Sequence, residues 1–193
     1  KSAWLELYDK PVVYFPKFFH PDPTVKRQSG FLMPKFETSS SLGDSFSIPY
    51  FKVISESKDL TFTPKIFNES EGLFQNEYRQ KNKNSSHITD LSLKKSESKS
   101  SSHFFSNTLA DLELSFFDNS ELEFNIETTS SDNYLKSHKI KSDITNNNSL
   151  LNSFLSIKGN NKDLYVEAKV EAYEDLTKEK SSDRYQYLFP SFE

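Results

Sequence analysis

The sequence predicts an all-β fold of antiparallel strands, of the kind that forms outer-membrane β-barrels. Apolar residues make up only 34% of the 193 residues, yet aromatic residues make up 15%. Disordered chains are poor in aromatic residues, so this composition fits apolar residues spread thinly along many strands. Short runs in which apolar and polar residues alternate recur along the chain, with polar turns between them.

Charge, cysteine content and hydropathy narrow the function classes. The formal net charge of −4 argues against a nucleic-acid-binding surface. The chain has no cysteine, which excludes a disulfide or a thiolate metal site within it. No run approaches the roughly 18 apolar residues of a transmembrane helix, whereas a barrel strand needs only about 9 to 11 residues.

The first residues predict two short strands. Ala3–Tyr8 and Pro11–Phe19 are apolar runs around an Asp9-Lys10 turn. Within the second run, Val12–Phe15 is apolar without interruption, as expected of a strand buried on both faces. The two prolines of His20–Thr24 prevent continued pairing and predict a stiff connector.

After the basic pair Lys26 and Arg27, longer strand patterns begin. We therefore expect a domain boundary near residues 20–28, with residues 1–28 ending one domain and residues 29–193 forming part of another. The chain starts at Lys1 without a signal peptide and both begins and ends in strand-like sequence, so we expect an internal fragment of a longer exported protein.

Residues 29–50 predict a β-hairpin with a proline inside each arm. Aromatic and aliphatic residues fill both arms, and the polar Thr38–Asp44 tract supplies the turn. Proline has no N–H to donate to a sheet, so it is normally confined to edges, strand starts and bulges. Because Pro34 and Pro49 lie well inside the arms, we predict a hairpin with weakened pairing.

Beyond the hairpin, alternating patterns bring the total to about ten barrel-type strands. The later strands are expected at Leu60–Ile66, Leu73–Lys81, His87–Lys95, His103–Phe117, Glu121–Thr129, Leu150–Lys158, Asp163–Glu174 and Arg184–Phe192. Short turns such as Gly159–Asn161 tend to alternate with longer polar loops such as Ser130–Ser149. This asymmetry is typical of barrels with short periplasmic turns and longer external loops.

The clearest alternation lies in Leu164–Tyr173. Leu164, Val166, Ala168, Val170 and Ala172 share one face, and Glu167, Lys169 and Glu171 share the other. We expect the apolar face to contact lipid and the charged face to line the lumen. A soluble antiparallel sheet with one wet face gives the same alternation, so this strand alone does not separate the two folds.

Several motifs resemble the family of lipopolysaccharide-assembly proteins LptD, also called organic-solvent-tolerance proteins. Tyr14–Pro34 carries them most densely, with His-Pro-Asp-Pro before a basic pair and then Ser-Gly-Phe-Leu, a form similar to alphaproteobacterial members. Further similar motifs, in order and at family-like spacing, are Ile48–Phe51, Asp59–Pro64, Asn76–Arg79 and Ser130–Leu135. The later strands depart from the family by being unusually rich in Ser, Asn and Lys.

The resemblance implies a periplasmic jellyroll domain followed by a very large outer-membrane barrel. Residues 1–28 would then be the end of the jellyroll and the connector, and residues 29–193 the first part of the barrel. The partners implied are lipopolysaccharide, the periplasmic bridge protein LptA and the plug lipoprotein LptE. The implied location is the outer membrane, with the N-terminal part in the periplasm.

The resemblance also implies roles for particular residues. Pro34 and Pro49 match the family's prolines in the first two barrel strands, which weaken pairing at a lateral gate. Val13, Phe15 and Phe31 would line the lipid route at the junction between jellyroll and barrel. Lys26 and Arg27 could contact lipid phosphates, although a basic pair beside a membrane strand is equally typical of an interfacial anchor.

The sequence carries no pattern for bond chemistry. The four histidines lack metal-ligand spacing, no Gly-x-Ser-x-Gly occurs, and the carboxylates of Glu121–Glu127 follow the period of a solvated strand face. We expect no catalytic residue, no metal and no cofactor, and hence not an enzyme. The alternatives are another outer-membrane barrel, such as a porin, transporter or barrel hydrolase, and a soluble β-rich binding module.

Overall fold

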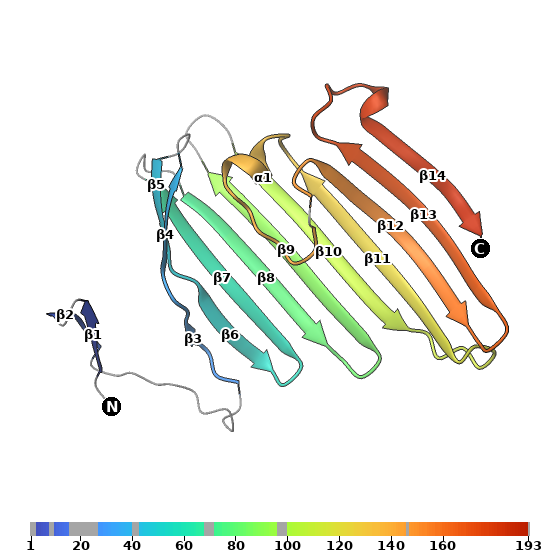
Figure 1. Cartoon of the computed structure of the whole chain (residues 1–193), viewed down its shortest axis with the longest axis horizontal. Coiled ribbons are helices and arrows are strands. Elements are labelled where there is room, and N and C mark those ends of the chain that lie inside the picture. The colour runs from blue at the N-terminus through green and yellow to red at the C-terminus, as the bar shows by residue number, and fades with distance from the viewer. Residues whose placement is uncertain are drawn as a thin grey trace.

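The structure is a computed structural model, which describes residues 3–7, 10–15, 27–39, 43–67, 72–95, 100–145 and 147–192. Its elements are shown in Figure 1: β1 (Ala3–Leu7), β2 (Lys10–Phe15), β3 (Gly30–Phe31), β4 (Lys35–Ser39), β5 (Gly43–Ser47), β6 (Tyr50–Ser55), β7 (Lys58–Phe67), β8 (Gly72–Lys81), β9 (Ser85–Lys95), β10 (Ser101–Asp111), β11 (Asn119–Thr129), α1 (Tyr134–Ser137), β12 (Leu150–Asn160), β13 (Tyr165–Asp175), η1 (Ser182–Arg184) and β14 (Tyr185–Phe192).

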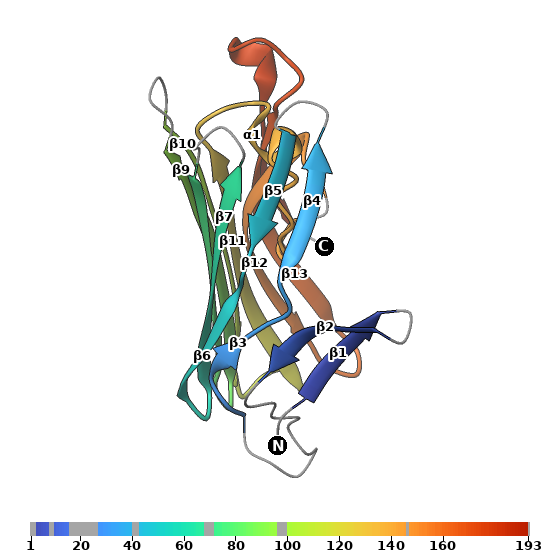
Figure 2. The same cartoon turned by 90° about the vertical axis from the view of Figure 1, so that its left-hand side faces the viewer.

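The strands form two antiparallel sheets. β1 pairs with β2, as predicted, in a two-stranded sheet, and the other strands form a twelve-stranded sheet. In the large sheet most neighbours in space are neighbours in sequence, from β14 at one edge to β4 at the other. The antiparallel all-β prediction is confirmed, and the sheet is curved but open rather than closed into a barrel (Figure 2).

Ten arms build the large sheet, because β3 with β4 and β5 with β6 are halves of two interrupted arms among its twelve strands. By contrast, β12 and β13 pair without a break from Leu150↔Asp175 to Asn160↔Tyr165. Among the described residues, no helix combines the length and the apolar character needed to cross a membrane.

Alternation gives the sheet one apolar and one polar face. In register, Phe74 lies opposite Leu93, Leu91 opposite Phe104, and Phe124 opposite Leu155, so the apolar side chains of successive strands share one face. The helix α1 lies on the concave side of the sheet (Figure 2), and its contact with Ser92 identifies this as the polar face.

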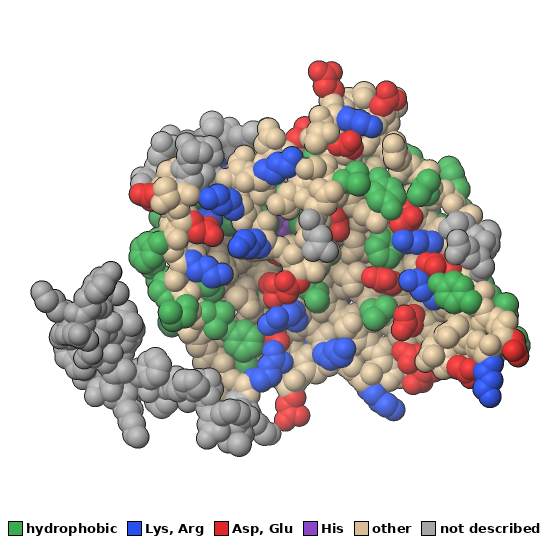
Figure 3. Space-filling view, viewed as in Figure 1, with side chains coloured by type: hydrophobic (Ala, Val, Ile, Leu, Met, Phe, Trp, Pro, Cys, Tyr) green, Lys and Arg blue, Asp and Glu red, His purple; other side chains and the backbone are tan. Residues whose placement is uncertain are grey.

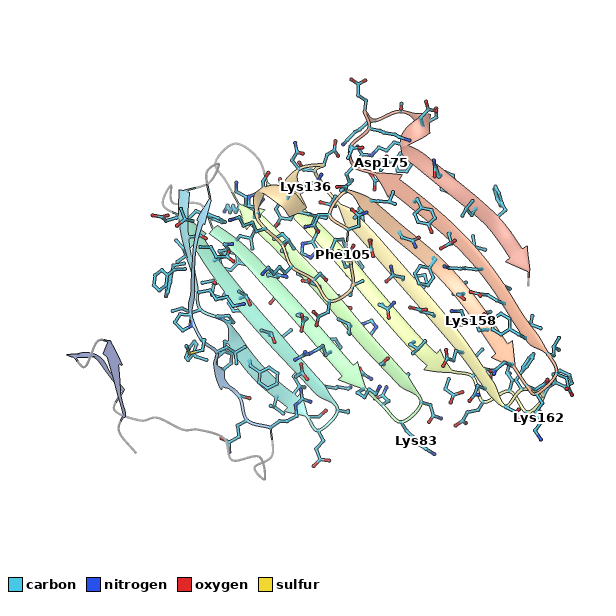
Figure 4. All side chains as sticks on the ribbon, in the orientation of Figure 1. Lys83, Phe105, Lys136, Lys158, Lys162 and Asp175 are labelled. Carbon is cyan, nitrogen blue, oxygen red and sulfur yellow. The ribbon has the colours of Figure 1, made fainter. Side chains whose placement is uncertain are left out.

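Short turns and longer loops occupy opposite ends of the sheet, as predicted. β6 and β7 are joined by only two residues, and the turns that hold Lys83 and Lys162 lie at the same end (Figure 4). The long connection between β11 and β12 lies at the other end, near Lys136 and Asp175 (Figure 4). We call these the turn end and the loop end.

Among the described residues, most predicted strand boundaries lie within two residues of those observed, and one differs by more. β10 ends at Asp111 rather than at Phe117, although the apolar pattern continues through Leu114 and Phe116. Glu113 has a φ of 48°, and its N–H is bound by the Asp111 carboxylate at 3.0 Å, so the chain leaves the extended conformation there.

The apolar core sits at the loop end. Its buried members come from the strands, from the segment after β13 and from the long connection that sequence analysis treated as a plain polar loop; they are Phe67, Leu73, Phe105, Tyr134, Leu135, Ile140, Leu151 and Leu176. Residues 130–145 of that connection, hereafter the strap, contain α1 and fold onto the polar face of the sheet.

Candidate functional site

The two arms of the first hairpin are both interrupted at their prolines. β3 pairs with β6 only through Gly30↔Phe51 and Phe31↔Tyr50, and regular pairing resumes at Lys35↔Ser47, where β4 meets β5. Pro34 and Pro49 lie in the gap. Three residues of the first arm, Leu32–Pro34, therefore face two of the second, Ile48–Pro49, which is the count of a β-bulge.

One backbone hydrogen bond crosses this gap among the described residues: the Leu32 N–H donates to the Pro49 carbonyl at 2.8 Å. Pro34 and Pro49 offer no N–H of their own. The two arms therefore have fewer backbone hydrogen bonds between them at the prolines, as predicted. This gap lies at a free edge, because β4 is the last strand of the sheet on this side.

Large apolar side chains cluster on the first arm at this edge. Phe31 is 76% exposed, Met33 82% and Phe36 80%. The Phe31 ring contacts Tyr50 edge-on at 5.0 Å, and Phe36 lies against Phe46 at 4.6 Å. The edge thus offers both unpaired backbone groups and exposed apolar area.

Arg27 anchors the segment that leads into this hairpin. Its guanidinium pairs with the buried carboxylate of Asp59 and lies over the Phe51 ring, 5.5 Å from the ring centroid. The Asp59 carboxylate also accepts a hydrogen bond from Arg79 Nε at 3.0 Å. Ser29 Oγ accepts the Val53 N–H at 2.8 Å. The predicted phosphate-binding residue Arg27 thus already has an anionic partner, while Lys26 and the side chains of Val13 and Phe15 lie outside the described residues.

The apolar face of the sheet is exposed across six strands, β8 to β13. Its large side chains are each between 36% and 49% exposed; they are Phe74, Leu91, Leu93, Phe104, Phe124, Leu155, Ile157, Val166 and Val170. The aliphatic alternation predicted for Leu164–Tyr173 belongs to this face. A soluble monomer rarely exposes an apolar surface of this extent, which identifies it as a surface that something covers.

The opposite face is polar and crossed by ion pairs, as Figure 3 shows by the mixed Lys, Arg, Asp and Glu side chains spread over it. Lys169 pairs with Glu171 at 2.6 Å and lies over the Phe154 ring at 4.5 Å, and Lys158 (Figure 4) reaches Glu167 at 3.7 Å. The three charged residues predicted to oppose Val166 and Val170 therefore interact across this face.

The strap is held on the polar face by a buried hydrogen-bond network. The Tyr134 and Ser92 hydroxyls are 2.7 Å apart, and Ser92 Oγ is 2.6 Å from His103 Nδ1. His103 Nε2 lies 3.3 Å from Asp90 Oδ1 but makes no hydrogen bond with any described residue. Gln75 donates to both Asp90 carboxylate oxygens at 3.1 Å and to the strap carbonyl of Lys141 at 2.9 Å. Burial raises the pKa of the Tyr134 hydroxyl, which keeps it neutral in this network.

Ser92, His103 and Asp90 have the residue types of a hydrolase triad, but not its access. Ser92 is 2% exposed, His103 3% and Asp90 0%, and the Ser92 hydroxyl is already bound by Tyr134. A nucleophile must reach a substrate carbon, which this burial prevents. The network instead docks the strap, and sequence reasoning missed it because Tyr134 lies 42 residues from Ser92 in the chain and no motif links them.

Further contacts connect the strap to both edges of the sheet, near β4 and near β14. Lys139 Nζ donates to the Thr38 carbonyl of β4 at 3.0 Å. Asp132 accepts a bond at 2.7 Å from Arg184, whose guanidinium is buried and also binds Glu174 at 2.7 Å. These carboxylates raise the pKa of Arg184 and keep it charged. Phe105 lies on the sheet face that the strap covers (Figure 4).

Among the described residues, no cluster of His, Cys, Asp and Glu could hold a metal ion. The structure therefore brings together an interrupted edge hairpin, an exposed apolar face and a strapped polar face. Of these, sequence reasoning identified the first two from the prolines and the alternation, and it missed the strap.

In comparisons with known proteins, the chain is similar over part of its length to LPS-assembly proteins LptD. Over 78 residues the chain is 40% identical to the LPS-assembly protein LptD of Chromobacterium violaceum, which is 40% of this chain and 10% of that protein. The LptD proteins of Shewanella denitrificans (44% over 73 residues, 38% and 9%) and Idiomarina loihiensis (36% over 81 residues, 40% and 11%) are similar in the same way. The chain thus matches about a tenth of the length of these relatives. No family model matches the chain.

Proposed function

We propose that this chain is the beginning of an outer-membrane barrel, with the end of a periplasmic jellyroll before it, in a protein that delivers lipopolysaccharide to the outer leaflet. The observation that carries the proposal is the proline-interrupted hairpin at a free sheet edge, in a chain similar to LPS-assembly proteins LptD. The names of these relatives describe assembly, and delivery of this kind needs no bond chemistry in the barrel.

The gate is the interrupted hairpin. Each backbone hydrogen bond contributes about 0.5–1.5 kcal/mol net in water, and an unsatisfied group facing lipid costs more. Pro34 and Pro49 remove donors where the first arm meets the second, so the first arm separates from its neighbours more easily than arms paired like β12 and β13.

The two sheet faces have different surroundings. The exposed apolar face contacts the acyl chains of the bilayer, and the ion-paired face lines the lumen. Soluble proteins rarely expose an apolar face that crosses six strands, which supports the membrane assignment over a soluble binding module.

The junction carries the lipid into the barrel. Residues 1–28 end the jellyroll, and Val13, Phe15 and Phe31 form an apolar route toward the hairpin, with Lys26 and Arg27 beside it to meet lipid phosphates. Phosphate competes with Asp59 for Arg27, whose side chain is 50% exposed. The partners are LptA on the periplasmic side and LptE inside the barrel.

Photo-crosslinking tests this route in the intact protein in cells. Crosslinking amino acids at Val13, Phe15 and Phe31 should capture lipopolysaccharide, whereas one at Val170, halfway along β13 on the apolar face, should capture phospholipid or nothing. Capture at Val170 but at none of the three junction positions would show that the route is misplaced.

A further inference from the structure

A third proline lies in the strand next to the interrupted hairpin. Pro64 is inside β7, which pairs with the second arm on one side and with β8 on the other. Pairing between the second arm and β7 stops after Ser47↔Lys65 and resumes at Tyr50↔Phe62 with no change of register. Ile48 therefore lies opposite Pro64 in this second gap.

The direction of the missing donor follows from the Leu32–Pro49 bond. In an antiparallel sheet the N–H and C=O of one residue point to the same neighbouring strand, and the direction alternates along the chain. Pro49 accepts from Leu32 at 2.8 Å, so Pro49 faces the first arm and Ile48 faces β7. Directly opposite residues face each other, so the absent N–H of Pro64 points at the Ile48 carbonyl.

We infer that Pro64 is a third positioning residue of the gate. It extends the weakened pairing from the boundary between the first and second arms to the boundary between the second arm and β7. Pro34, Pro49 and Pro64 then lie at one level across three neighbouring arms. The two arms of the hairpin are consequently able to loosen together from β7, as one flap, instead of the first arm opening alone. This consequence for transport rests on the proposed function, whereas the weak second boundary does not.

The hairpin has attachments on each side of this line of prolines. Toward the loop end, Glu37 pairs with Lys65 of β7, and Lys139 of the strap binds Thr38. Toward the turn end, Arg27 pairs with Asp59 of β7. The flap would therefore bend at the proline line while side chains guide its two ends.

Amide hydrogen exchange of the intact protein in lipid nanodiscs tests the inference directly. Phe46 faces the same neighbour as Ile48 but lies opposite Ile66, which has an N–H. In the unaltered protein the Ile48 amide should exchange about two- to tenfold faster than that of Phe46, the range that one backbone hydrogen bond allows. Equal exchange rates for the Ile48 and Phe46 amides would show that pairing with β7 is not weakened at Pro64, and this comparison needs no variant.

Pro64→Ala restores the donor and should slow exchange across residues 45–50 by about the same factor. Pro190→Ala, in β14 at the opposite edge of the sheet, is the matched control and should leave residues 45–50 unchanged. No slowing in Pro64→Ala, or equal slowing in both variants, would overturn the inference. Normal lipopolysaccharide delivery by a Pro34→Ala/Pro49→Ala protein would instead count against the proposed function and leave this comparison untouched.

Discussion

Val170 and Lys169 are adjacent in β13 but belong to opposite faces of the sheet. Val170 is 47% exposed on the apolar face, while the Lys169 ammonium is held by Glu171 at 2.6 Å. If the apolar face contacts lipid, the two positions must respond differently to the same side chain.

Val170→Arg is expected to destabilise the proposed barrel by about 2–4 kcal/mol if the residue lies near the bilayer midplane. Lys169→Arg, the matched control, keeps a cation on the polar face and should cost far less. Urea unfolding of the intact protein in lipid vesicles measures both. Equal costs would mean that the apolar face does not contact lipid.

Single residues also show where sequence reasoning succeeds. The alternation in Leu164–Tyr173 placed Val166 and Val170 on the face opposite to Glu167 and Lys169, and the structure confirms this, because side-chain direction in a strand is set by the local backbone. The burial of Asp90 could not be predicted in this way, since it depends on Gln75 and His103 from neighbouring strands.

At the scale of elements, the strap joins distant parts of the sheet through one buried turn of helix. Leu135 is fully buried and Ile140 is 5% exposed, while Lys136 between them is exposed. Because α1 has only four residues, it has little stability of its own and depends on these contacts.

Leu135→Ala should therefore cost about 2–5 kcal/mol and release the strap. Lys136→Ala removes an exposed side chain from the same helix, so it should leave the strap in place. Limited trypsin digestion measures release as cleavage after Lys139 and Lys141. Equal cleavage rates in the two variants would show that Leu135 does not hold the strap.

The elements that sequence analysis misplaced share a physical cause. The end of β10 and the fold of the strap depend on contacts between residues far apart, such as Tyr134 with Ser92, whereas strand patterns are local. The adjacent apolar residues Tyr134 and Leu135 in a polar tract were the one local sign of a docking segment. The hairpin gap was predictable because the missing N–H of proline is a property of the residue itself.

At the scale of the whole molecule, the described part of the chain has two open edges, at β4 and at β14. An open edge in hydrocarbon leaves backbone N–H and C=O groups without partners, at a cost of several kcal/mol for each group. The ten arms therefore need further strands, or one another, before they can span a bilayer.

Residues 29–193 produced alone should not give a stable membrane-inserted monomer. Refolding into vesicles, followed by protease digestion and unheated gel electrophoresis, measures insertion. A protease-resistant, heat-modifiable monomer would show that these arms close on themselves and would remove the need for additional strands.

The proposed gate at Pro34 and Pro49 is tested most directly by measuring lipopolysaccharide at the cell surface in an intact Pro34→Ala/Pro49→Ala protein, with Pro190→Ala as the control. Two restored donors, each worth about 0.5–1.5 kcal/mol, should shift the opening equilibrium roughly tenfold or more toward the closed state. If these prolines weaken the gate, the double variant should fold correctly but show reduced surface lipopolysaccharide, and the control should deliver lipopolysaccharide normally. Normal delivery by a correctly folded double variant would contradict the proposed gate.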